Sequence, residues 1–202
     1  MNLAIIKYNA GNIRSVLFAI ERLGISATVT DDCDELRSAD RVIFPGVGEA
    51  SSAMAYLKAR KLDQLIKDLS QPVLGICLGM QLMCKYSEEN ETECLGIFQE
   101  IVKKFRIDKE GDSKGDVVKV PQIGWNNISD LKSALFNGVP EDSYCYFVHG
   151  YYADFGNDTI ATTDYIQSYS SALNKKNFYG VQFHPEKSAE VGNRILQNFM
   201  TV

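Results

Sequence analysis

The chain has 202 residues, of which 45% are hydrophobic and 23% are charged, a composition typical of a globular protein with a full-sized core. Its 26 acidic side chains outnumber 21 basic ones, and this balance argues against nucleic acid or an anionic membrane as the main partner. No apolar stretch approaches the roughly 18 residues that a membrane-spanning helix needs.

Short apolar runs alternate with helical patterns through the first half of the chain. The expected strands are Leu3–Tyr8, Ser26–Thr30, Arg41–Pro45 and Gln71–Cys77. The expected helices are Asn12–Leu23, much of Glu49–Leu69, and Gly79–Tyr86. Alternation of this kind predicts an α/β fold with a doubly wound, mostly parallel sheet.

The second half consists of apolar runs joined by short turns. Its expected strands are Ile101–Phe105, Val117–Ile123, Ser143–His149, Thr159–Thr163, Ser170–Leu173 and Asn177–Gln182, with a polar hairpin tip at Lys109–Gly115 and a closing helix at Lys187–Thr201. These short strands predict an antiparallel patch added to the parallel sheet. No repeat or linker interrupts the pattern, so we expect one domain over residues 1–202.

The strongest local motif is Gly-Ile-Cys-Leu-Gly at residues 75–79. It has the form of a nucleophile elbow, in which a strand turns sharply into a helix and presents its central residue, here Cys77. The flanking glycines relieve the tight turn, and amides at the start of the helix favour the thiolate. The alternative is a buried structural cysteine in a glycine-rich turn.

A thiol nucleophile needs a base, and the chain has two histidines. In extended backbone His184 and Glu186 point to the same side, so Glu186 can orient the imidazole as the third member of a triad does. An edge-strand pair without catalytic function is the alternative. His149 has no acidic residue two positions away, and we interpret it as structural or as a neighbour of the site.

Backbone amides near the elbow can form an oxyanion hole. Pro-Gly-Val-Gly at residues 45–48 follows an expected strand, so an N–H of Gly46 or Val47 could act together with the N–H of Leu78. A plain strand–helix turn is the alternative. Gly48 and Gln81 are candidate substrate-binding residues, since Gln81 lies one helical turn after the cysteine; a surface glutamine is equally compatible with that spacing.

The five cysteines contain no Cys-x-x-Cys pair. Their spacing matches no zinc or redox site, so we expect a reduced, cytoplasmic thiol protein with no metal.

Together these residues resemble the class I (triad) glutamine amidotransferases. The elbow at residues 75–81 and Phe-His-Pro-Glu at residues 183–186 are similar to that family's nucleophile motif and His-Pro-Glu box. Within the family, the glutaminase subunits of imidazole glycerol phosphate synthase are similar at Tyr8–Val16, Pro45–Glu49, Pro121–Asn126 and His184–Ser188. The resemblance implies a flavodoxin-like fold and hydrolysis of glutamine through a Cys77 thioester, with no cofactor.

The resemblance also implies a partner, a cyclase subunit with a (β/α)8 barrel that forms a heterodimer and receives ammonia through a tunnel. Trp125, Tyr146 and Lys187 match positions that the family uses at the interface and ammonia gate, and Asn12 lies in a segment that borders the partner. Core packing is the alternative for Trp125, the one tryptophan of the chain.

Two departures from the family pattern stand out. Lys7-Tyr8-Asn9 replaces the common Asp-Tyr-Gly, although Asn tolerates the positive φ of such a turn. Gly150 follows His149 where the family usually has a hydroxyl residue, so a side-chain contact to glutamine is lost there. Three other functions remain open: an amidotransferase subunit for surface-sugar amination, an intracellular cysteine peptidase, and a non-catalytic interaction subunit.

Overall fold

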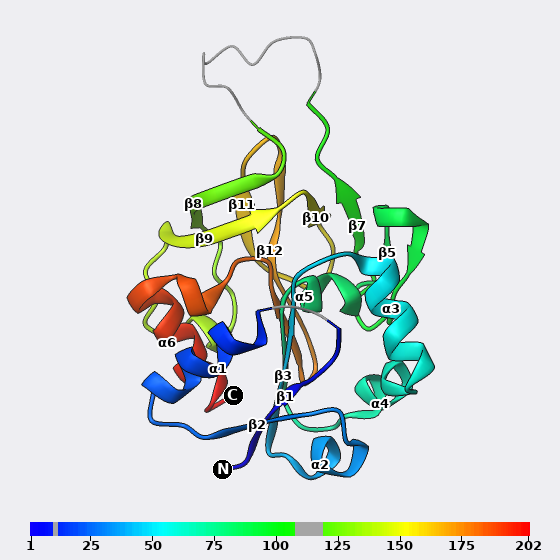
Figure 1. Ribbon diagram of the computed structural model, residues 1–202. Coiled ribbons are helices and arrows are strands. Elements are labelled where there is room, and N and C mark those ends of the chain that lie inside the picture. The colour runs from blue at the N-terminus through cyan, green and yellow to red at the C-terminus, as the bar shows by residue number, and fades with distance from the viewer. Residues whose placement is uncertain (10–11, 108–118) are drawn as a thin grey trace.

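The computed structural model describes residues 1–9, 12–107 and 119–202, and its centre is a sheet whose inner strands are apolar at nearly every position. In spatial order the strands are β2 (Ala27–Thr30), β1 (Leu3–Ile6), β3 (Arg41–Gly46), β4 (Val73–Cys77), β13 (Phe178–Val181), β12 (Ser168–Lys175), β10 (Tyr151–Ala153), β7 (Ile101–Lys104), β5 (Tyr86–Ser87) and β6 (Thr92–Glu93), with β11 (Thr159–Asp164) paired to β12. Among the described residues, β8 (Gln122–Ile128) and β9 (Ser143–His149) form a separate antiparallel ribbon (Figure 1).

The sheet has the two parts that the sequence predicts. Strands β2, β1, β3, β4 and β13 run parallel to one another. From β13 onward, β12, β10 and β7 pair antiparallel. The expected parallel sheet with an antiparallel patch is therefore confirmed.

Helices cover both faces of this sheet. They are α1 (Ile13–Arg22), α2 (Cys33–Ser38), α3 (Ala50–Ala59), α4 (Leu62–Asp68), α5 (Leu78–Met83) and α6 (Ala189–Phe199), with short 3-10 turns at Glu89–Glu91, Ala134–Phe136 and Pro185–Lys187. Figure 1 shows α1 and α6 on one side of the sheet and α3 and α4 on the other.

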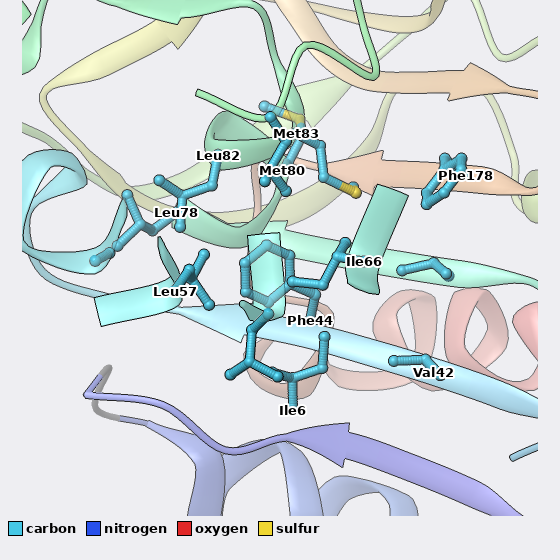
Figure 2. Packing of buried hydrophobic residues seen from close by; sticks show 14 of the residues in the cluster. Ile6, Val42, Phe44, Leu57, Ile66, Leu78, Met80, Leu82, Met83 and Phe178 are labelled. Carbon is cyan, nitrogen blue, oxygen red and sulfur yellow. The ribbon is translucent and has the colours of Figure 1, made fainter. Parts of the chain in front are cut away.

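Alternate side chains of each strand supply the two cores. In β1, Leu3 and Ile5 pack with α1 and α6, whereas Ile6 packs with α2, α3, α4 and α5. Figure 2 shows the second core, where Ile6 and Phe44 from the strands meet helix residues such as Leu57. Because both faces are covered, the carboxyl ends of the parallel strands remain as the open edge where an α/β fold builds its site.

Three local expectations are corrected in the first half of the chain. The helix expected over Glu49–Leu69 is two helices, because Lys61 adopts a left-handed φ of 58° that interrupts it. Helix α2 was not predicted, although Asp32 caps it by accepting the amides of Asp34 and Glu35. The short strands β5 and β6 were also missed, as was β10 in the second half, because two or three residues are too few for a periodic pattern.

The strand expected at Val117–Ile123 was placed too early. Strand β8 begins at Gln122 and continues to Ile128, so it crosses the polar Gly-Trp-Asn-Asn stretch and is stabilised there by pairing with β9. The start of the expected strand and the hairpin tip at Lys109–Gly115 lie outside the described residues. No helix in the described ranges is both long and apolar enough to cross a membrane.

Candidate active site

Cys77 stands at the junction of β4 and α5 with φ 52° and ψ −111°, a backbone conformation that non-glycine residues rarely adopt. The flanking glycines permit this turn. A Cβ on Gly75 would lie 2.8 Å from the amide nitrogen of Met80, and one on Gly79 would overlap the carbonyl oxygen of Phe44. Cys77 therefore has the geometry of the predicted elbow.

His184 and Glu186 lie beside the elbow, after the end of β13. Nδ1 of His184 is 2.7 Å from Oε1 of Glu186, and their side chains are 1% and 0% exposed. The other ring nitrogen, Nε2, is buried and has no partner with hydrogen-bond geometry among the described residues. That nitrogen is available to exchange a proton with the thiol, through a contact that can tighten when substrate binds.

The electrostatics of His184 favour its protonated form. Burial lowers the pKa of His184, but the neighbouring side chains of Cys77 and Glu186 outweigh burial and raise it to about 10. A protonated imidazole next to the sulfur stabilises a thiolate, which is the reactive form of cysteine. The arrangement can therefore supply both a nucleophile and a proton for a leaving group.

Asn12 also belongs to this cluster, a position that the sequence did not reveal. Its Nδ2 donates a 2.7 Å hydrogen bond to Oε1 of Glu186, the same oxygen that faces His184. Asn12 adopts a left-handed φ of 72° just before α1, whereas Asn9, where the sequence suggested such a turn, is not among the residues with positive φ. The charge reversal at Lys7 falls on an exposed side chain.

A cavity of about 310 Å³ opens at Cys77. Its lining residues are Val47, Gly48, Cys77, Leu78, Gln81, Glu89, Pro121, Val148, His149, Gly150 and Tyr151. Four of the predicted site residues, Val47, Gly48, Leu78 and Gln81, are thus brought to the nucleophile. Gly46 lies behind them, opposite Cys77 in the β3–β4 register.

Glu89 is a lining residue that sequence reasoning missed. It is the one acidic side chain among the described lining residues, and it accepts the Ala50 amide at 2.8 Å. Burial raises the pKa of Glu89. It lies in a 3-10 turn without a motif, so no sequence signal pointed to it.

The Gln81 side chain is largely occupied by hydrogen bonds within the protein. Its Nε2 donates to the carbonyl oxygen of Tyr151 at 3.0 Å and to Oε1 of Gln182 at 2.9 Å. Both amide hydrogens are thereby used inside the protein. Only Oε1 of Gln81 is left to contact a bound molecule.

His149 forms part of the cavity wall. Its Nδ1 lies 2.6 Å from the Tyr151 carbonyl oxygen, and its Nε2 is 3.3 Å from the Tyr169 hydroxyl. Burial lowers the pKa of His149 to about 4, so the ring is neutral near pH 7. Both nitrogens face groups other than the sulfur, and these contacts suit a structural neighbour better than a base.

The β8–β9 ribbon presents aromatic side chains to solvent next to the site. Trp125 pairs with Tyr146 across the strands, and Trp125 is 53% exposed. The Lys187 ammonium lies 5.7 Å above the Tyr146 ring. The structure therefore brings these three predicted interface residues together, whereas Asn12 points to Glu186.

Donor groups for a metal are not gathered anywhere in the described ranges: no three His, Cys, Asp or Glu side chains are placed to hold an ion.

Comparisons with known proteins agree with this geometry. The chain matches the family model described as "Glutamine amidotransferase class-I" over residues 5–202. It is 56% identical over 200 residues to a Bacteroides fragilis protein named "Imidazole glycerol phosphate synthase subunit HisH", with 99% of each chain covered. A Shewanella loihica protein of the same name is 46% identical, over 97% of this chain and 88% of the relative.

Solved structures show the same fold. A Thermoplasma acidophilum protein described as a "putative gmp synthase subunit a protein" has a TM-score of 0.75 at 20% identity, covering 100% of this chain and 92% of that one. A glutamine amidotransferase from Thermotoga maritima has a TM-score of 0.64 at 18% identity, covering 100% and 83%. The chain belongs to the class I glutamine amidotransferase family and, within it, to the HisH group.

Proposed function

We propose that this chain is the glutaminase subunit of an imidazole glycerol phosphate synthase. It hydrolyses glutamine to glutamate and ammonia, and it passes the ammonia to a cyclase subunit in histidine biosynthesis. The observation that carries the proposal is the Cys77–His184–Glu186 cluster beside a cavity, in a chain 56% identical to a HisH protein.

The Cys77 thiolate attacks the carboxamide carbon of glutamine and forms a tetrahedral oxyanion. Collapse of this intermediate breaks the C–N bond as protonated His184 gives its proton to the leaving nitrogen, so ammonia departs and a glutamyl thioester remains. Neutral His184 then takes a proton from water, whose oxygen attacks the thioester. Collapse of the second intermediate releases glutamate and restores the thiolate–imidazolium pair.

The oxyanion is held by backbone amides. The N–H of Leu78 follows the nucleophile directly, and an N–H of Gly46 or Val47 is the second donor. Support comes from Val47 and Leu78 in the cavity lining and from Gly46 opposite Cys77 in the β3–β4 register. Such donors stabilise charge that develops only in the transition state.

The rest of the lining fits the amino-acid end of the substrate. A cavity of about 310 Å³ is at the small end of ligand sites, which suits a single amino acid. Glu89 is the group for the α-ammonium, while Gly48, Oε1 of Gln81 and the backbone of Gly150 contribute polar contacts. The five cysteines are free thiols, in keeping with a reducing cytoplasm.

The partner we propose is a (β/α)8-barrel cyclase in a heterodimer. The exposed ribbon face carries Trp125 and Tyr146 beside Lys187, and tryptophan and tyrosine are enriched in interface cores. This face adjoins the cavity wall, because Val148 belongs to the same strand and lines the site. Ammonia released at Cys77 therefore leaves close to the docked partner.

The test is glutamate release by the purified chain, alone and with its cognate cyclase carrying a bound ligand. Cys77→Ala should abolish synthesis with glutamine and leave synthesis with ammonium salts intact. Retained glutamine-dependent turnover would disprove the assignment of the nucleophile. Cleavage of peptides without the cyclase would instead support a peptidase.

A further inference from the structure

We propose that Gln182 is an additional catalytic residue, whose side-chain amide stabilises the Cys77 thiolate. Nε2 of Gln182 lies 3.6 Å from the Cys77 sulfur with hydrogen-bond geometry. The inference rests on the proposed function only in taking Cys77 as the nucleophile. It adds a neutral donor to the site, distinct from His184.

The fold places Gln182 next to the sulfur. Val181, the last residue of β13, is paired with Ile76 in the parallel β13–β4 register. The residues that follow these two, Gln182 and Cys77, are therefore also neighbours. Gln182 is fully buried, and its backbone amide donates to the Ser171 carbonyl oxygen at 2.8 Å. A buried, backbone-anchored amide holds its position with little freedom.

Neighbouring groups decide which end of the Gln182 amide faces the sulfur. The Tyr151 carbonyl oxygen can only accept, so Gln81 must turn its Nε2 toward it. The second hydrogen of that nitrogen then requires an acceptor, which is Oε1 of Gln182 at 2.9 Å. The orientation of Gln182 is thereby fixed with its N–H groups toward Cys77.

The Gln182 amide keeps its hydrogen-bond donors through the whole reaction, whereas His184 loses and regains a proton. Gln182 and His184 are separated by one residue after the end of β13, and Glu186 lies in the 3-10 turn that follows, so both an amide and an imidazole lie beside the sulfur. His184 gives its proton away when ammonia leaves and regains one when it activates water. Gln182 keeps its N–H groups throughout, and it stabilises the thiolate again when the sulfur leaves the glutamyl carbon.

The experiment measures alkylation of Cys77 by iodoacetamide in the full chain on the acid side of its rate–pH profile, where less than half of the sulfur is thiolate. Cys77 is resolved from the other cysteines by peptide mass spectrometry. The rate follows the thiolate fraction. Gln182→Met removes the donor at similar volume and should slow labelling about tenfold, as expected for a charge-assisted hydrogen bond. Nearly isosteric Gln182→Glu places an oxygen beside the sulfur and should slow labelling further.

The matched control is Gln71→Met. The Gln71 side-chain amide donates to the Leu36 carbonyl oxygen at 2.7 Å, away from Cys77, so labelling should be unchanged. In the complex with cyclase, the Gln182 variants should lower kcat in parallel with labelling and leave KM within about twofold. If Gln182 serves only to pack the core, Cys77 in Gln182→Glu should be labelled at the wild-type rate, and that result overturns the proposal.

Gln81→Leu covers the case in which the Gln182 variants fail to fold. It leaves Gln182 in place but frees its amide to rotate, so labelling should slow by a smaller factor; an unchanged rate overturns the proposal. A different result separates this inference from the proposed function. If the Gln182 variants slow labelling but the wild-type chain releases no glutamate with the cyclase, the proposed function is contradicted and this inference still holds.

Discussion

Removing the Asn12 side chain tests whether this residue serves the triad or the partner surface. Asn12 donates to Glu186 Oε1 at 2.7 Å, and the other carboxylate oxygen, Oε2, is buried without a partner among the described residues. Among the described residues, loss of the amide leaves the carboxylate with a single hydrogen bond, to His184. Glu186 then becomes less able to hold the imidazole in position.

The magnitude follows from that one contact. A hydrogen bond to a charged group contributes about 1.5–3 kcal/mol, and about 1.36 kcal/mol in the barrier changes a rate tenfold. When the whole contribution of this hydrogen bond is lost from the transition state, kcat falls roughly 10- to 150-fold with little change in KM. Because Asn12 has φ 72°, Asn12→Ala adds backbone strain of about 1–2 kcal/mol, whereas Asn12→Gly does not.

The assay is glutamate release at saturating glutamine and saturating cyclase. Asn12→Gly and Asn12→Ala should lose similar activity, and Asn12→Ala should lower the thermal midpoint further than Asn12→Gly does. Asn12→Asp should be worse than either, because a second carboxylate faces Glu186. A variant with full kcat but weaker affinity for the cyclase would refute the reasoning and assign Asn12 to the interface.

Three further predictions follow from the site and its support. His149 has a folded pKa of about 4, below its unfolded value of about 6.5. Its stabilising contribution is therefore present above about pH 6.5 and is lost as the pH falls toward 4. In denaturant titrations over that window, the free energy of unfolding of the wild type should fall by up to about 1.4 kcal/mol per pH unit relative to that of His149→Gln. Trp125→Ala should weaken cyclase binding by about tenfold or more in titration calorimetry, whereas Phe155→Ala, equally exposed at 53%, should not. Gly79→Ala should fail to fold or lose several kcal/mol, since the new Cβ overlaps a backbone carbonyl, while Gly150→Ala, whose nearest neighbour would be 3.9 Å away, should melt like wild type.

The elbow was predictable because its residues encode a backbone shape. Cys77 needs positive φ, and the glycines beside it are the residues that allow a helix to follow a strand so closely. The contact of His184 with Glu186 was predicted correctly, but from an extended backbone that the structure does not have, because Glu186 lies in the 3-10 turn Pro185–Lys187. Gln182 reaches the sulfur through the pairing of β13 with β4, which no local pattern in the sequence reveals.

Contacts between distant segments were not predictable. Asn12 and Glu186 are 174 positions apart, and no local pattern relates them. Strand β8 was misplaced because its Gly-Trp-Asn-Asn stretch has no apolar alternation and depends on pairing with β9. Lys61 is an ordinary helix former, so nothing in its type indicated the left-handed φ that divides α3 from α4.

Strand β9 of the ribbon contacts both the active site and the proposed partner surface. In β9, the Tyr146 carbonyl oxygen accepts the His184 amide at 2.9 Å, and the Tyr146 amide donates to Ser188 at 2.9 Å. Two residues later, the Val148 carbonyl oxygen lies 3.9 Å from the Cys77 sulfur. The Tyr146 ring, meanwhile, faces Trp125 and Lys187. A protein that binds the outer face of the ribbon therefore contacts the same strand that positions both His184 and the cavity wall at Cys77. A shift of that strand on binding would change the position of the catalytic groups, and the partner could control glutamine hydrolysis in this way.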